Sequence, residues 1–256
     1  MSYKSAVIFD SPVAYWRLGE SSPSDPAKDE IDGNDGTYEG TPTVGVTGLL
    51  TGDSNKAMQL TGDGSFVDSP DIPALNSPTE FTLECLVKTA NDVGGKSFVS
   101  VTLLGASDKY LLFTDSGKDL FLQVTTADGP QNCGIANVLS AGSTFHLAAT
   151  YDSVTGTAKL YVNGSLVKTQ VLTGGVPLAG ERVWIGKATF GYPTNGVIDE
   201  VAVYDHVLSA GRVTVHYTES QTPSTDNNDI FDQTGHLLND SDHFLNESGH
   251  FVQRVL

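Results

Sequence analysis

The sequence is poor in cysteine and in basic residues. Only two of its 256 residues are cysteines, Cys85 and Cys133, and they provide neither a disulfide framework nor the spacing of a metal site. Lys and Arg number 14 against 31 Asp and Glu, which gives a formal net charge of −17. Such a surface repels phosphate backbones, which argues against nucleic acid or an anionic membrane as partner. The acidic excess suits solubility or a hard cation such as calcium.

Long apolar runs are also missing. No segment is long enough to span a membrane, so we expect no membrane insertion. The first ten residues contain one lysine and four consecutive apolar residues, which is too weak a pattern for a secretory signal. We therefore expect either that a leader has been removed or that the protein leaves the cell by another route.

The chain does contain many glycines, 27 in all, and many short runs typical of β-strands. The clearest runs are 57–60, 81–88, 97–104, 110–113, 120–124, 146–151, 158–162, 182–186 and 196–204. Asn163-Gly164, between two of them, is one of the strongest hairpin signals. The series predicts an all-β domain over residues 1–218, with two antiparallel sheets packed as a sandwich or jelly roll. Ser209 is a good N-cap and predicts one short helix over about 210–217.

The strand around Cys85 predicts part of the core. Phe81, Leu83, Cys85 and Val87 alternate with other residues and therefore share one face of the strand. We expect a buried, unreactive thiol at Cys85 rather than a disulfide. Trp16 and Trp184 also lie within strand-like runs and are expected in the core.

The C-terminal residues have a different character. Residues 219–230 are almost entirely polar and predict a flexible linker. Residues 231–256 repeat with a period of seven, but their apolar residues are adjacent rather than at coiled-coil spacing. We predict short strands that become ordered only by self-association or by docking on a partner. The residues expected to carry this oligomerisation or attachment are His236, Leu237, Leu238, His243, Phe244, Leu245, His250, Phe251 and Val252.

The three repeated histidines also suggest a metal-binding interpretation, because imidazole is a common metal ligand. A seven-residue repeat, however, aligns every position of the repeat and not only the histidine. We favour the repeat itself as the reason for their regular spacing.

Several segments of the first 218 residues occur in a characteristic order. They are 12–20, 29–37, 81–84, 146–152, 160–164 and 198–204, the last leading into 208–209. Taken together, these segments resemble the laminin-G-like, concanavalin A-like jelly-roll family, in the variety found in bacteriophage virion and bacterial surface proteins. The resemblance covers nearly all of residues 5–218 and implies a lectin-like jelly roll.

The resemblance also implies a structural calcium site. Its ligands would come from the early loop, at Asp29, Asp32 and Gly33, and from Asp199 on the late strand. Calcium in this place would join the N-terminal segment to the last strand, because it binds six to eight oxygens. The alternative is that 32–36 form an ordinary turn and that Asp199 has a purely local role.

A carbohydrate site would need exposed aromatic rings beside hydrogen-bonding groups. Tyr192 lies in a loop bounded by Gly191 and Pro193 and is the candidate ring, with Asn195 as its polar neighbour. An ordinary packing role for Tyr192 is the alternative.

Catalysis has little support in the sequence. Some enzymes of this fold cleave glycans with alternating carboxylates on one strand, and retaining chemistry needs the two carboxyl groups about 5–5.5 Å apart. Here Asp199 and Glu200 are adjacent, so we expect them to point to opposite faces of the strand. No nucleophile elbow or phosphate-binding loop is present. We expect a protein that is not an enzyme.

These observations lead to one functional expectation and one alternative. We expect a non-enzymatic bacteriophage virion protein, a capsid decoration or fibre component, that displays a lectin-like domain for host-surface or environmental glycans. The tail would bind other virion proteins or other copies of the chain, as a homo-oligomer on the virion surface. The alternative is a secreted bacterial carbohydrate-binding or adhesion module, located outside the cell or on its surface.

Overall fold

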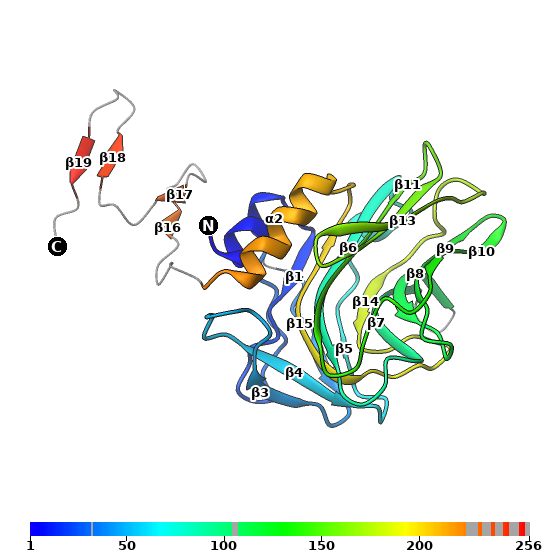
Figure 1. The fold of residues 1–256 in the computed structure, drawn as a ribbon, viewed down its shortest axis with the longest axis horizontal. Coiled ribbons are helices and arrows are strands. Elements are labelled where there is room, and N and C mark those ends of the chain that lie inside the picture. The colour runs from blue at the N-terminus through cyan, green and yellow to red at the C-terminus, as the bar shows by residue number, and fades with distance from the viewer. Residues whose placement is uncertain are drawn as a thin grey trace.

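Figure 1 shows a β-sandwich with both α-helices of the domain on one side of it. This computed structural model describes residues 1–31, 33–103 and 107–223, together with four short strands farther along the chain. The helices are α1 (Tyr3–Phe9), the 3-10 helix η1 (Pro73–Leu75) and α2 (Ala210–Gln221). The strands of the sandwich are β1 (Ala14–Trp16), β2 (Thr37–Glu39), β3 (Thr43–Thr47), β4 (Lys56–Thr61), β5 (Phe66–Asp68), β6 (Glu80–Thr89), β7 (Lys96–Leu103), β8 (Ser107–Thr114), β9 (Leu120–Thr126), β10 (Gly129–Ile135), β11 (Thr144–Asp152), β12 (Thr157–Val162), β13 (Ser165–Val171), β14 (Arg182–Ile185) and β15 (Asn195–Tyr204).

The strands form two antiparallel sheets, as the sequence predicts. The eight-stranded sheet has the order β13-β12-β11-β6-β15-β4-β3, with β1 also pairing β15, and the seven-stranded sheet has the order β10-β9-β8-β7-β14-β5-β2. The predicted all-β jelly roll is confirmed. Neighbours that are distant in sequence, such as β6 beside β15, make the fold depend on long-range pairing.

The core lies between the sheets and follows the alternation of the strands. Phe81, Leu83, Cys85 and Val87 all belong to the main hydrophobic cluster, as predicted for one face of β6. Phe81 also stacks on Tyr110 of the opposite sheet, with ring centroids 4.1 Å apart. Both cysteines are buried free thiols. Burial raises the pKa of each thiol, which keeps it protonated and unreactive.

The predicted hairpin at Asn163-Gly164 is present between β12 and β13. Both residues have positive φ, 50° and 72°, the combination that a type I′ turn requires. Glycine is needed here for a second reason, because a Cβ at this position would lie 2.9 Å from the Cβ of Tyr217 on α2. The hairpin therefore also forms part of the surface on which α2 packs.

The two helices cover the outer face of the eight-stranded sheet. α2 begins where predicted, with the Ser209 hydroxyl accepting a hydrogen bond from the Arg212 amide at 3.2 Å, but it continues to Gln221. Its last three residues thus belong to the stretch predicted as linker. α1 was not predicted: Val7 and Ile8 favour strands, and a Ser2 cap together with packing against α2 makes this segment helical.

A β-bulge in β15 changes the expected direction of two carboxylates. Asp199 pairs with Leu86 whereas Ala202 pairs with Glu84, so β15 has one residue more than β6 between these pairs. The extra residue lies around Glu200, which has a φ of 52°. Because a bulge interrupts the alternation, Asp199 and Glu200 both face outward, and the expectation of opposite faces was wrong.

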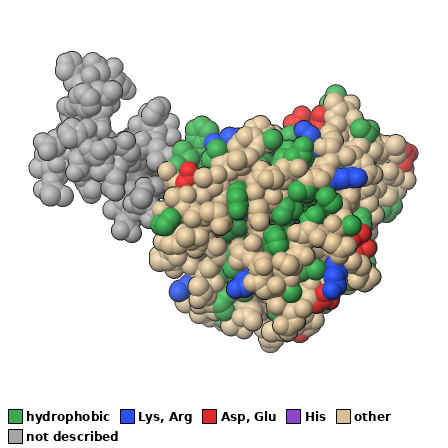
Figure 2. Space-filling model, in the orientation of Figure 1, with side chains coloured by type: hydrophobic (Ala, Val, Ile, Leu, Met, Phe, Trp, Pro, Cys, Tyr) green, Lys and Arg blue, Asp and Glu red, His purple; other side chains and the backbone are tan. Residues whose placement is uncertain are grey.

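In the view of Figure 2, the charged side chains do not form one large patch of a single sign. Side chains of Lys and Arg and of Asp and Glu lie in small separate groups, with hydrophobic side chains in several patches between them. Within the described residues, no helix is long and apolar enough to cross a membrane.

Beyond Pro223 the structure describes only β16 (Ile230–Phe231), β17 (Leu237–Leu238), β18 (His243–Leu245) and β19 (Phe251–Gln253). β16 pairs with β17, and β18 pairs with β19, both antiparallel. The adjacent apolar residues of each repeat thus lie in a strand: Leu237-Leu238 in β17, Phe244-Leu245 in β18 and Phe251-Val252 in β19. His236 and His250 lie outside the described residues, as do residues 224–229 of the predicted linker.

Candidate functional site

The outer face of the seven-stranded sheet is partly exposed, because α1 and α2 lie on the other sheet. Its middle is covered by the loop after β14: Ser100 and Leu111 are fully buried, and Leu111 clusters with Ala188 and Tyr192 of that loop. Trp184 of β14 pairs with Asp68 of β5 and with Ser100 of β7. Ser100 pairs with Leu111 of β8, which pairs with Gln123 of β9. Directly opposite residues of antiparallel strands share a face. We call the outward side chains of this sheet the open sheet face.

Trp184 is the central aromatic residue of the open sheet face. Its ring lies against Phe66 with centroids 5.1 Å apart at 63°, and the Lys187 ammonium is 4.2 Å from the Phe66 ring and 5.1 Å from the Trp184 ring. The Trp184 indole N–H donates to Asp68 Oδ1 at 2.9 Å. Both rings are half-buried and keep part of their surface in solvent. The prediction that Trp184 is a core residue was therefore wrong.

Charged groups lie next to these rings and are held in place by ion pairs. Arg182 Nη1 is 3.2 Å from Asp68 Oδ2, and its Nη2 is 2.8 Å from Asp71 Oδ1. Asp68 thus receives hydrogen bonds from both Arg182 and Trp184. The arrangement places fixed hydrogen-bonding groups beside a partly exposed aromatic surface, which is the combination that a sugar ring requires.

Tyr192 belongs to a second aromatic group of the open sheet face. It stacks on Phe113 with centroids 6.4 Å apart and meets Phe190 edge-on at 5.3 Å. Tyr192 is half-buried, whereas Phe190 has 48% of its surface exposed. Asn195 instead begins β15, where it pairs with Thr61. The loop therefore presents Phe190 more openly than Tyr192, and Asn195 contributes to the other sheet.

The sequence contained a signal for the outward direction of the Trp184 side chain, which the prediction of a core residue did not use. Val183 and Ile185 on either side of it are both buried in the core. Alternation along a strand then directs the residue between them outward. Phe66 and Phe190 had no comparable signal, because their exposure depends on which strands and loops meet on this face.

Asp29, predicted as a calcium ligand, is fully occupied by hydrogen bonds. Its Oδ1 accepts from the amides of Tyr15 at 2.8 Å and Ile31 at 3.1 Å. Its Oδ2 accepts from the Asn34 amide at 3.2 Å and the Asn34 side chain at 2.8 Å. Four bonds use the lone pairs of a carboxylate, so Asp29 organises its loop and offers no free oxygen to a metal.

Asp199 lies in different surroundings from Asp29. Its Oδ2 accepts from the Leu49 amide at 2.7 Å, while Oδ1 is buried without a hydrogen-bond partner. Burial, and then the charge of Glu200, raise the pKa of Asp199 well above its usual range. Gly33 is exposed and Asp32 lies outside the described residues. No cluster of three metal-ligating side chains occurs among the residues described, and the calcium site stays a prediction.

Glu200 makes the contact between the chain ends that was expected of Asp199. It is fully buried and accepts hydrogen bonds from the Tyr15 hydroxyl and, at 2.9 Å, from Arg17 Nε. Arg17 also reaches Asp53 Oδ2 at 2.7 Å through Nη2. The carboxylates around Arg17 raise its pKa against the opposing effect of burial, so it is permanently charged. Glu200 thus ties β15 to β1 and fixes Arg17.

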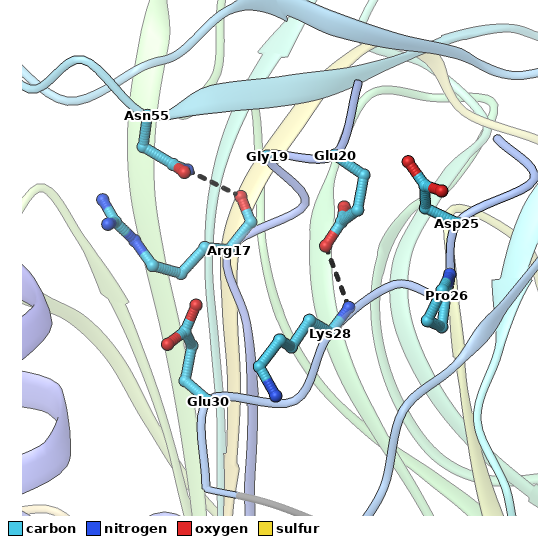
Figure 3. A pocket seen from close by; sticks show the side chains of 8 residues that line it. All are labelled: Arg17, Gly19, Glu20, Asp25, Pro26, Lys28, Glu30 and Asn55. Carbon is cyan, nitrogen blue, oxygen red and sulfur yellow. Dashed lines mark hydrogen bonds between the residues drawn. The ribbon is translucent and has the colours of Figure 1, made fainter. Parts of the chain in front are cut away.

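Arg17 lies at the edge of an open pocket of about 410 Å³, which is shown in Figure 3. The pocket is lined by Arg17, Gly19, Glu20, Asp25, Pro26, Lys28, Glu30 and Asn55. In Figure 3, Glu20 and Asp25 stand on one side and Glu30 on the other, with Lys28 between them. This pocket was not among the sites predicted from the sequence, because its walls come from segments that only the fold brings together.

A buried polar network lies beneath α1 and α2, on the outer face of the eight-stranded sheet. Glu84 Oε1 is 2.6 Å from His146 Nε2 and 2.9 Å from His216 Nδ1, and Glu84 Oε2 accepts from the Tyr204 hydroxyl at 2.9 Å. His216 and Glu84 are both fully buried, and His216 Nε2 lies 2.9 Å from Asp10 Oδ2. We call this set the Glu84 network. No solvent reaches its centre, so it holds the helices rather than a ligand.

Solved structures share this fold at low sequence identity. Domain 4 of AbnA, a GH43 extracellular arabinanase from Geobacillus stearothermophilus solved with arabinotriose, has a TM-score of 0.61 at 18% identity over 80% of this chain and 98% of that one. The binding domain of botulinum neurotoxin serotype G has a TM-score of 0.62 at 12% identity over 81% of this chain and 51% of that one. The binding domain of botulinum neurotoxin DC, solved in complex with SialylT, has a TM-score of 0.62 at 13% identity over 89% and 55%.

At these identities the likeness establishes the fold alone. The chain spans about half the length of the neurotoxin binding domains that it matches. No curated protein sequence matches it. The sequence profile of the concanavalin A-like lectin/glucanases superfamily matches residues 61–214, more than half of the chain, and the chain therefore belongs to that superfamily.

Proposed function

We propose that the domain is a non-enzymatic glycan-binding module and that it binds glycans on the open sheet face. The observation that carries this proposal is the pair of partly exposed rings of Trp184 and Phe66, with Asp68 and Arg182 fixed beside them. The apolar face of a sugar would lie on the rings while its hydroxyls bond the charged groups. A complex with arabinotriose in a protein of the same fold is consistent with this function.

The position of the adjacent carboxylates supports binding without catalysis. Asp199 and Glu200 face the same way, but they are 1% and 0% exposed. General acid or nucleophilic action requires direct access to the glycosidic oxygen or the anomeric carbon. A glycan at the surface could not reach either carboxylate.

The glycan site predicts a large effect of Trp184→Ala. A glycan identified on an array should lose at least about tenfold in affinity by titration calorimetry, since truncating an aromatic anchor costs about 2 kcal/mol or more. Phe9→Ala is the matched control, because Phe9 is 64% exposed on α1, away from this sheet. Unchanged affinity in Trp184→Ala, or an equal loss in both variants, would contradict the assignment.

We further propose that the protein is a bacteriophage virion component on the particle surface and that residues 231–256 attach or oligomerise it. The support is the heptad repeat and its short paired strands, β16 with β17 and β18 with β19. Two-stranded pairs of two or three residues are not stable alone, so they need further strands from a partner or from another copy.

Removing residues 224–256 should therefore convert an oligomer into a monomer while the sandwich stays folded, because α2 and Pro223 are retained. Light scattering coupled to gel filtration measures the mass directly. Combined substitution of Leu238, Phe244 and Phe251 by Asp should have the same effect, whereas Ser241→Asp should not. An unchanged mass after deletion would contradict self-association, and unchanged attachment to particles would contradict attachment through residues 231–256. Failure of the full chain to attach to particles would favour the secreted bacterial module.

A further inference from the structure

The loop after β14 lies between the two aromatic groups of the open sheet face. We call its residues 187–192 the crossing loop. Near its start, the Lys187 ammonium lies over the rings of Phe66 and Trp184. Three residues later, the Phe190 ring packs edge-on against the second aromatic group, with ring centroids 5.6 Å and 5.3 Å from its two nearest rings. The crossing loop therefore reaches from one aromatic group to the other.

A tight turn brings Phe190 to the outer surface of the crossing loop. The Gly191 amide donates to the Ala188 carbonyl at 3.3 Å, so Thr189 and Phe190 are the two central residues of the turn. Gly191 and Tyr192 both have positive φ, 103° and 61°, and such a value is uncommon for an aromatic residue. Phe190 is exposed as a result, whereas Ala188 before it is buried against the sheet.

A buried carboxylate holds this turn to the sheet. Asp108 of β8 is 4% exposed, and its Oδ2 accepts hydrogen bonds from the Thr189 amide at 2.9 Å and from the Thr189 hydroxyl at 2.6 Å. Its Oδ1 accepts from the Ser100 hydroxyl. Within the described residues, the partners of this carboxylate are hydroxyl and amide groups, and none is a cation. A buried carboxylate without a cation is unfavourable unless hydrogen bonds stabilise it, so Asp108 and Thr189 hold each other in place.

The two aromatic groups are too far apart for one sugar ring to lie on both. Trp184 pairs with Ser100, which pairs with Leu111 on β8. Phe113 follows Leu111 by two residues and faces the same way. Two steps between strands and one step along β8 separate Trp184 from Phe113 by about 12 Å. Phe190 packs on Phe113, so a ligand that contacts both groups must extend over several sugar residues.

We propose that the open sheet face binds oligosaccharides in preference to single sugars, because Phe190 forms a second stacking platform in addition to that of Trp184 and Phe66. This inference rests on the proposed glycan-binding function. A glycan chain on the first platform would continue past Lys187 and along the crossing loop to Phe190. Asp108 is a positioning residue, since it touches no sugar but holds the turn that presents Phe190. A turn that is already fixed lowers the entropy cost of binding.

The test uses oligosaccharides of two to six residues prepared from β-glucan, xylan, mannan and arabinan. Each series is titrated into the full chain and followed by NMR chemical shifts. For a series that binds, affinity should rise from the disaccharide to the hexasaccharide. Phe190→Ala should lower the affinity for the hexasaccharide about tenfold, as expected for loss of an aromatic anchor, and leave that for the disaccharide unchanged. Phe9→Ala, an exposed phenylalanine on α1, should change neither affinity.

Further variants test Asp108 as the positioning residue. Asp108→Ala and Thr189→Val should each reproduce the selective loss of hexasaccharide affinity and increase amide hydrogen exchange in the crossing loop. Thr189→Val takes the place of Asp108→Ala if the latter does not fold, and Asp108→Asn, which keeps an acceptor, should restore part of the affinity. Thr155→Val is the matched control, because the Thr155 hydroxyl donates to Asp152 at 2.7 Å in a turn of the other sheet.

The outcomes separate this inference from the proposed function. Absence of binding in every series, or binding that Trp184→Ala leaves unchanged, would contradict the glycan site itself. Binding that Trp184→Ala weakens, but with equal affinity for disaccharide and hexasaccharide or with no loss in Phe190→Ala, would overturn the second platform alone. A loss in Phe190→Ala that neither Asp108→Ala nor Thr189→Val reproduces would overturn the role of Asp108.

Discussion

Replacing Glu84 with alanine should lower the free energy of unfolding by about 3–5 kcal/mol, because removing one partner from a buried ion pair leaves the other charge uncompensated. Glu84 is fully buried at the centre of contacts from His146, His216 and Tyr204. The interaction with His216, and then the hydrogen bonds from both histidines, lower the pKa of Glu84 well below its usual range despite burial. The carboxylate is therefore ionised throughout the neutral range.

The size of this effect follows from how α2 is attached. Only Val213, His216 and Ser220 of α2 are buried, so the helix has almost no apolar face. Polar contacts hold it instead: Arg212 Nε lies 2.7 Å from Asp10 Oδ2, and His216 reaches both Glu84 and Asp10. Loss of Glu84 removes the link between these groups and β6, so α2 and α1 should loosen together.

Denaturant unfolding of the variants measures this prediction. Glu84→Gln keeps the shape of the side chain and should lower the free energy of unfolding by less than Glu84→Ala does. It takes the place of Glu84→Ala in the test if the alanine variant does not fold. Glu39→Ala is the matched control: Glu39 is exposed on β2, so its replacement should change stability by no more than about 0.5 kcal/mol. A Glu84→Ala loss as small as that of the control would show that the network does not hold the helices.

The stability of the domain should fall as the pH rises from about 6.5 through about 9, owing to His216. The charge of Glu84, and then the hydrogen bond to Asp10, raise the pKa of His216 to about 9 against the opposing effect of burial. A histidine in the unfolded chain has a pKa of about 6.5. The folded state thus binds the proton more tightly, so this contribution is complete below about pH 6.5 and lost above about pH 9.

The loss of folding stability between these pH values should amount to about 3 kcal/mol, the free energy that corresponds to the difference between the two pKa values of His216.

The same network lowers stability in acid as well, through its carboxylates. The pKa values of Glu84 and Asp10 are lowered, so their contribution is present above their unfolded pKa values near 4 and decreases as the pH falls. Melting temperatures across the pH range should therefore decline toward both extremes.

His216→Gln should remove most of the alkaline decline. His206→Gln is the control, since His206 lies at the surface with 39% of its side chain exposed, and the decline should persist in this variant. An alkaline decline of the same size in His216→Gln would show that another group causes it.

The burial of the Glu84 network could not be predicted from the sequence of β6. Alternation in β6 placed Phe81, Leu83, Cys85 and Val87 in the core, and the structure confirmed this. The same alternation placed Glu84 on the outer face, which an isolated strand would expose to water. Two helices from the ends of the domain cover that face instead, and nothing within the strand indicates that they do.

The sequence by itself determined the sandwich, the Asn163-Gly164 hairpin and the start of α2, because strand alternation, turn residues and helix caps act within a few residues of one another. Only the tertiary structure decided that α1 is helical, that a bulge turns Asp199 and Glu200 to one side, and that Trp184 lies on an open face. It also brought together the pocket beside Arg17. These features depend on which distant segments pack together, and that information is spread over the whole chain.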